Sequence, residues 1–143
     1  MHIREAVRGD IPRLQQIRAA VRENILRNQS LVQPRDYEDH IDGRGRSWVA
    51  EDDGVILGFS SADGQTATIW ALFVDPAHEG RGAGRALLAP AVAWLFDRGA
   101  DVVALTTAPG TRAERFYRAG GWTAHGLSAS GELRLSLARP ADV

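Results

Sequence analysis

The residues with the clearest potential for chemistry lie in the glycine-rich segment HEGRGAGRALL, residues 78–88. Gly80, Gly82 and Gly84 alternate with other residues directly before an apolar run that predicts a helix. The first N–H groups of a helix have no partner within it, and the helix dipole makes that end positive. With no side chains in the way, a phosphate can approach these N–H groups closely. The other interpretation is a flexible connection between a strand and a helix.

Two common nucleotide-binding motifs are excluded by the residues around these glycines. The fingerprint GxGxxG needs a third glycine at Leu87 if it begins at Gly82, or at Arg85 if it begins at Gly80. The P-loop needs a Gly-Lys-Ser/Thr sequence, and the chain contains no lysine. The segment therefore predicts a pyrophosphate held by the main chain, with Arg81 and Arg85 adding positive charge.

Composition is that of an ordinary globular protein, and the 143 residues predict one domain spanning 1–143. A formal net charge of −1 gives no indication of nucleic acid or of a membrane surface as a partner. The absence of cysteine excludes disulfides, thiolate metal sites and a cysteine nucleophile. The four histidines lack metal-ligand spacing, so no metal is expected. We also expect no signal peptide and no membrane span, with the cytoplasm as the compartment.

Hydrophobic periodicity predicts the elements that position the glycine-rich segment. Strands are expected at 2–7, 47–51, 55–62, 66–75, 101–107, 121–125 and 132–137, and helices at 9–26, 33–41, 81–98 and 111–120. Asp10 is expected to cap the first helix. The order β-α-α-β-β-β-α-β-α-β-β predicts an α/β fold with a mixed sheet. Within it, the strand–helix–strand unit over 66–107 predicts a parallel pair with a right-handed crossover.

Two segments together resemble the GCN5-related N-acetyltransferase (GNAT) superfamily. The coenzyme A loop of that family reads Gln/Arg-x-x-Gly-x-Gly/Ala after a strand that ends in Val-x-Pro. VDPAHEGRGAG is similar to it, with Glu79, Gly82 and Gly84 at the matching positions. A later family segment reads Asn-x-x-Ala-x-x-Phe-Tyr-x-x-x-Gly-Phe, and this chain has there Gly110, Ala113, Phe116, Tyr117, Gly121 and Trp122. The expected order of elements is similar to the family fold over nearly the whole chain.

The resemblance implies an acetyl-CoA-dependent N-acetyltransferase in which the amine attacks the acetyl carbonyl directly, with no covalent enzyme intermediate. It implies cofactor contacts from the 66–75 strand and the glycine-rich loop, namely Leu72, Phe73, Val74, Glu79, Gly80, Arg81, Gly82, Ala83, Gly84 and Arg85. A main-chain N–H near Leu72 or Phe73 is the implied oxyanion donor. Tyr117 matches the tyrosine that protonates or hydrogen-bonds the departing thiolate. We expect Tyr117 to face the cofactor while Phe116 lies in the core; the alternative makes Tyr117 a core aromatic.

The chain departs from the family pattern at three positions. Glu79 replaces glutamine or arginine, and a carboxylate beside a pyrophosphate is unfavourable unless it points to solvent. Gly110 replaces an asparagine, and Thr111 is expected to cap the helix in its place. Many members carry a glutamate on the central strand, at about the position of Trp70 here. The general base therefore stays open between a water chain, a side chain of the first two helices and no dedicated base.

The acceptor is expected to be a small-molecule amine or an amino terminus, in a cleft walled by the first two helices. Four residues in this region are either bases or solvated surface groups: Glu23, Asp36, Glu38 and His40. Trp70 and Phe59 either form an aromatic wall for the acceptor or fill the core. Three arginines either meet the 3′-phosphate of coenzyme A or form a solvated helix face: Arg112, Arg115 and Arg118.

A second class of function stays open, namely a degenerate family member that senses acyl-CoA without turnover. Glu79, Gly110 and the missing strand carboxylate favour the sensor, whereas Tyr117 favours the enzyme. A homodimer is the expected assembly, because ELRLSL at 132–137 alternates and is expected at an edge of the sheet.

Overall fold

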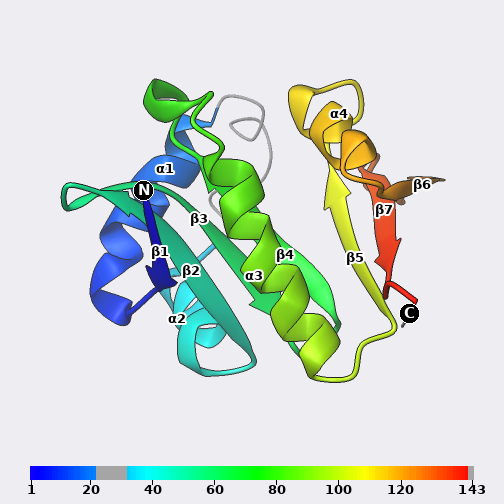
Figure 1. Ribbon diagram of the computed structural model, residues 1–143, viewed down its shortest axis with the longest axis horizontal. Helices are drawn as coiled ribbons and strands as arrows, with labels where there is room; N and C mark the ends of the chain where they lie inside the picture. Colours follow the sequence, from blue (N-terminus) through cyan, green and yellow to red (C-terminus); the bar gives the residue numbers. More distant parts are fainter. Residues whose placement is uncertain (22–31, 142–143) are drawn as a thin grey trace.

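The computed structural model of the protein describes residues 1–21 and 32–141. Its strands are β1 (His2–Glu5), β2 (Gly45–Asp52), β3 (Val55–Asp63), β4 (Thr68–Val74), β5 (Val102–Thr107), β6 (Thr123–Leu127) and β7 (Leu133–Ala138). Its helices are α1 (Ile11–Ala20), α2 (Pro34–Asp42), α3 (Ala83–Asp97) and α4 (Arg112–Ala119), with short 3₁₀ turns η1 (Arg8–Asp10) and η4 (Pro76–His78). The strands form one sheet in the order β1-β2-β3-β4-β5-β7-β6 (Figure 1).

Helices cover both faces of the sheet, and a separate apolar core lies under each layer. Figure 1 shows α3 in front of the sheet and α1 and α2 behind it. Leu14 and Ile17 of α1 pack with Tyr37 of α2 on one face. Leu87 and Leu95 of α3 are fully buried on the other. The expected order of elements and the mixed α/β sheet are confirmed.

The parallel pair expected over 66–107 is confirmed, but β4 and β5 meet only at their first residues. Thr68 lies opposite Ala104, and no further pair of these two strands is recorded in the described structure. On its other side β4 follows β3 with a bulge: Ser61 faces Ala71 and Ala62 faces Ile69, so Trp70 is an extra residue. A bulge bends its strand, and β4 separates from β5 beyond this point (Figure 1).

Two helix boundaries differ from the expectation. The first helix, expected at 9–26, begins at Ile11 and ends at Ala20, and residues 22–31 lie outside the described structure. Asp10 does not cap it, because the Asp10 carboxylate accepts a hydrogen bond from the Val7 N–H and pairs with Arg4, both at 2.9 Å. Helix α3 begins two residues later than expected, since Gly82 has a φ of +81°, outside the helical region.

The expectation that 132–137 forms a sheet edge is wrong. Strand β7 lies between β5 and β6, and the edges of the sheet are β1 and β6. Alternation of apolar and polar residues fixes which face of a strand is buried, but it does not fix which strands lie beside it. The homodimer loses this basis and stays a prediction. None of the described helices is long and apolar enough to cross a membrane.

Candidate active site

A groove of about 670 Å³ runs along the start of α3 and one side of α4. This volume is within the range of small-molecule sites. All but one of the predicted cofactor contacts line it, together with residues of α4: Leu72, Phe73, Val74, Glu79, Gly80, Gly82, Ala83, Gly84, Arg85, Arg112, Ala113, Phe116 and Tyr117. The exception is Arg81, whose guanidinium lies 3.5 Å from the Asp52 carboxylate. We call this space the outer groove.

Two different structural features explain the glycines of the loop. Gly80 and Gly82 have φ angles of +82° and +81°, a region that glycine occupies without strain. A Cβ on either residue would meet no atom within 4 Å, so both face open space. Gly84 lies in the first turn of α3, where a Cβ would stand 3.7 Å from the Phe116 ring. At these three glycines the main chain beside the start of the 15-residue helix α3 is therefore not covered by a side chain of its own.

Glu79 spans from the loop to α4. Its Oε2 accepts a hydrogen bond from Nη1 of Arg112 at 2.6 Å, and both side chains are exposed. The carboxylate that seemed unfavourable beside a pyrophosphate is thus paired with a cation. Of the three arginines on α4, Arg112 alone lines the outer groove in the described structure. Arg118 pairs instead with Glu114, 2.8 Å away on the same helix.

Thr111 caps α4 as expected. Its hydroxyl accepts a hydrogen bond from the N–H of Glu114 at 3.3 Å. The Glu114 carboxylate in turn accepts the N–H of Gly110 at 2.8 Å. Gly110 has a φ of +75°, so its main chain makes the turn that leads into the helix. The loss of the family asparagine is therefore compensated locally.

A second, smaller space of about 130 Å³ opens where β4 and β5 separate. Its walls are residues 69–73 of β4 and 105–108 at the end of β5, with Glu132 from the β6–β7 connection. We call it the inner cavity. Five residues line both spaces: Val21, Leu72, Phe73, Ala113 and Tyr117. The outer groove and the inner cavity therefore meet at Tyr117.

Tyr117 is buried at this meeting point, with 6% of its surface exposed. Its ring packs edge-on against Trp122 at 5.6 Å between centroids. Burial raises the pKa of the Tyr117 phenol, because a phenolate is poorly solvated there, so the group keeps its proton.

The expectation that Phe116 lies in the core is wrong, since 37% of its surface is exposed and it lines the outer groove beside Tyr117. Consecutive helix residues are only about 100° apart. Phe116 and Tyr117 therefore both reach a groove that flanks α4.

The edge of β4 that faces β5 is open along the inner cavity. Beyond Thr68 no described strand pairs with it. Leu72 and Phe73 pair with Ser60 and Phe59 of β3 as successive residues of an antiparallel ladder, so one of the two turns its main-chain groups toward this open edge. Both residues line the cavity and the groove.

The described candidates for a base on α2 do not line the inner cavity. His40 is buried, with Nδ1 2.7 Å from the main-chain oxygen of Asp36 and Nε2 3.2 Å from the Asp63 carboxylate. Both ring nitrogens are thus engaged, Nδ1 within α2 and Nε2 between α2 and β3. Asp36 accepts the N–H of Gln33 at 2.7 Å, and Glu38 lies 3.7 Å from Arg8 at the surface. The fourth candidate, Glu23, lies outside the described residues.

The structure adds one carboxylate that the sequence did not single out. Among the described residues that line the inner cavity, Glu132 is the one with an ionisable carboxylate. It precedes β7, far along the chain from Trp70, and no local motif marks it.

The structure distinguishes the two aromatic residues that were expected either to line the acceptor site or to fill the core. Phe59 is fully buried in the core, whereas Trp70 is half-buried and lines the cavity.

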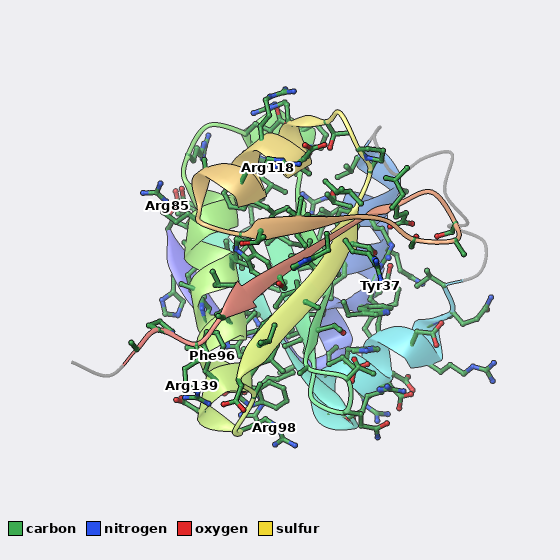
Figure 2. All side chains as sticks on the ribbon, turned by 90° about the vertical axis from the view of Figure 1, so that its right-hand side faces the viewer. Tyr37, Arg85, Phe96, Arg98, Arg118 and Arg139 are labelled. Atoms are coloured by element: carbon green, nitrogen blue, oxygen red, sulfur yellow. The ribbon has the colours of Figure 1, made fainter. Side chains whose placement is uncertain are left out.

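The two sides of the site lie on opposite sides of the sheet. Figure 2 shows Arg85 beside α3, Arg118 on α4, and Tyr37 on the other side with α2. The start of α3 therefore lies on one side of the sheet, and α1 and α2 lie on the other. The described residues include no group of three histidine, aspartate or glutamate side chains able to hold a metal ion.

A model of the acetyltransferase (GNAT) family matches residues 13–121. No curated protein matches the chain. The ribosomal-protein-alanine N-acetyltransferase from Brucella melitensis superposes with a TM-score of 0.80 at 23% identity, covering 97% of this chain and 100% of that one. The yncA protein from Salmonella typhimurium, solved with its cofactor acetyl-CoA, gives 0.78 at 23% identity, covering 100% and 96%. The PaiA N-acetyltransferase from Thermoplasma acidophilum, solved with coenzyme A, gives 0.78 at 12% identity, covering 96% and 98%.

The buried phenol of Tyr117 is expected to make the protein less stable in alkali. Its pKa is raised above the ordinary value of about 10, so above that pH the unfolded chain releases a proton that the folded chain keeps. This contribution to stability is complete below about pH 10 and declines as pH rises, by at most ~1.4 kcal/mol per pH unit. No lysine overlaps this titration. Urea unfolding between about pH 9.5 and 11.5 should show a shallower decline for Tyr117→Phe. An equal slope in both proteins would contradict the assignment.

Proposed function

The chain belongs to the acetyltransferase (GNAT) family, and from this premise we propose that it moves an acetyl group from acetyl-CoA to the amine of a small molecule or an amino terminus. The observation that carries the proposal is the meeting of the outer groove and the inner cavity at Tyr117. One space suits a long phosphorylated donor and the other a small acceptor. A buried proton donor lies between them.

The outer groove fits the coenzyme A pyrophosphate through its bare main chain. Gly80 and Gly82 face open space, and the uncapped start of α3 adjoins them. Unpaired N–H groups at a helix start favour an anion, so the main chain between Gly80 and Arg85 would hold the phosphates. Arg85 adds charge from the groove wall. When bound, acetyl-CoA supplies the activated acetyl thioester.

The residues around the meeting point have complementary roles in the transfer. The amine nitrogen forms a bond to the acetyl carbon, and the bond from that carbon to sulfur breaks. Main-chain N–H groups at Leu72 or Phe73 stabilise the charge on the carbonyl oxygen. The Tyr117 hydroxyl gives the departing sulfur a hydrogen bond, or its proton, which the phenol then regains from water. Glu132 accepts the proton that the amine loses, directly or through water.

The alternative function is an acyl-CoA sensor without turnover. The three departures from the family pattern that favoured it each have a local explanation. Arg112 pairs with Glu79, and Gly110 makes the turn that Thr111 caps. Glu132, which lines the same cavity as Trp70, supplies a carboxylate in place of the one missing on the strand. Thiol release from acetyl-CoA across a panel of amines separates the two functions, since a sensor releases none.

Replacing Gly84 with valine is expected to weaken coenzyme A binding by more than tenfold, which corresponds to ~1.4 kcal/mol. The main chain at Gly84 is helical, so a valine folds there, but its branched side chain occupies the groove between Val74 and Phe116. Ala89→Val is the matched control, because Ala89 is exposed on the same helix. Titration calorimetry with coenzyme A measures both variants. Equal affinities would overturn this placement of the pyrophosphate.

Replacing Tyr117 with phenylalanine removes the hydroxyl and keeps the ring that packs on Trp122. Coenzyme A affinity should barely change, whereas turnover should fall by about 10²–10⁴, the usual contribution of a positioned general acid. Single-turnover rates with a working acceptor give the loss at the chemical step. Near-normal rates would make the hydroxyl structural, and a parallel loss of affinity would make Tyr117 a binding residue.

Replacing Glu132 with glutamine is expected to lower kcat/KM by about 10²–10⁴ near neutral pH, as for removal of a general base. The deficit should shrink as pH rises, because a growing share of the acceptor amine is already neutral. Glu38→Gln, which changes a carboxylate outside the cavity, should leave the profile unchanged. A deficit that is constant with pH would exclude Glu132 as the base.

A further inference from the structure

Arg18 of α1 is held between two aromatic side chains of β4. Its guanidinium carbon lies 4.9 Å from the ring centroid of Trp70 and 4.9 Å from that of Phe73. Its Nε and Nη1 are buried and have no hydrogen-bond partner among the described residues. Burying unmet donors of a charged group is costly. Unmet donors of this kind in a folded protein are met by a bound molecule, either water or a ligand.

No described carboxylate compensates the charge of Arg18. Arg18 interacts with Tyr37 of α2, whose pKa is raised by burial, although the charge and hydrogen bonding of Arg18 oppose the shift. Tyr37 is therefore a neutral phenol. Arg13, five residues earlier on α1, is different: it pairs with Asp75 at 2.7 Å and donates to the main-chain oxygen of Ile56 at 2.9 Å. The charge of Arg13 is thus compensated within the fold, whereas the charge of Arg18 is not compensated by any described carboxylate.

The position of Arg18 connects it to the acceptor. Trp70 and Phe73, the two rings that hold the guanidinium, both line the inner cavity. Val21, three residues after Arg18, lines the cavity and the outer groove. The neighbouring Tyr37 lies on the side of the sheet opposite to Arg85 (Figure 2). Arg18 does not itself line the cavity, but it packs directly behind two residues of the cavity wall, Trp70 and Phe73.

We propose that Arg18 binds a carboxylate of the acceptor, so that the enzyme acetylates free amino acids in preference to the amino termini of proteins. This inference rests on the proposed function and names its substrate class. A guanidinium offers paired donors that match a carboxylate, and the flanking rings fix its orientation. A peptide carries a neutral amide in place of the α-carboxylate and leaves Arg18 uncompensated. Glu132 on the cavity wall has the opposite charge and suits the amino group of the same molecule.

The test compares each common amino acid with its own primary amide, in thiol-release assays with acetyl-CoA. For the acids accepted, kcat/KM should exceed that of the amide by at least about tenfold, or ~1.4 kcal/mol. Arg18→Met keeps an unbranched apolar side chain between the rings and should bring the ratio to about one. Arg35→Met, at an exposed position on α2, is the control and should leave the ratio unchanged. Amides used as well as acids, or a ratio unchanged in Arg18→Met, would overturn the proposal.

A binding experiment separates this proposal from the proposed function. The same acids and amides are titrated by calorimetry into protein saturated with coenzyme A, which requires no turnover. Acid-selective binding that Arg18→Met abolishes supports the role of Arg18 even if no amine is acetylated, in which case only the enzymatic function fails. Absence of selectivity in an active enzyme overturns the proposal alone. If Arg18→Met does not fold, Arg18→Lys decides instead, because a single ammonium lacks the paired donors and the ratio should fall severalfold.

Discussion

The separation of β4 from β5 is the constraint on which the rest of the structure depends. The two strands pair at Thr68 and Ala104 and then diverge, which opens a space in the middle of the sheet. The bulge at Trp70 bends β4 in this region. An unpaired strand edge inside a protein is unfavourable unless something satisfies its main chain. In the proposed function, the donor and acceptor of the reaction supply what a neighbouring strand does not.

Ion pairs at the rim hold the elements around this opening in place. Asp75, directly after β4, accepts hydrogen bonds from the Ala77 N–H at 3.0 Å and from Arg13 at 2.7 Å. Burial opposes ionisation of Asp75, but these contacts outweigh it and keep its pKa below the usual value. Across the groove, Arg112 connects α4 to Glu79 of the loop. The first pair ties the end of β4 to α1, and the second joins the two halves of the split sheet.

The sequence predicts what short-range patterns determine. The element order, the glycine turn before α3, the Thr111 cap and the tyrosine on α4 each depend on residues a few positions apart. The neighbours of a strand cannot be predicted in this way, because strand pairing is non-local. The alternation of 132–137 therefore did not show that β7 lies between β5 and β6. Glu132 and Arg18 were missed for the same reason. In the sequence, a glutamate before a strand and an arginine on an amphipathic helix have the appearance of solvated surface charges.

Burial has different consequences for the polar groups around the acceptor side, and this difference determines what the site can recognise. The phenols of Tyr117 and Tyr37 respond by staying neutral, since burial raises the pKa of each. Asp63 stays ionised because Arg44, 2.8 Å away, and hydrogen bonds from Gln65 and His40 outweigh its burial. A guanidinium does not become neutral at physiological pH. Arg18, with no counter-charge among the described residues, is therefore the group whose charge an acceptor is best placed to complete.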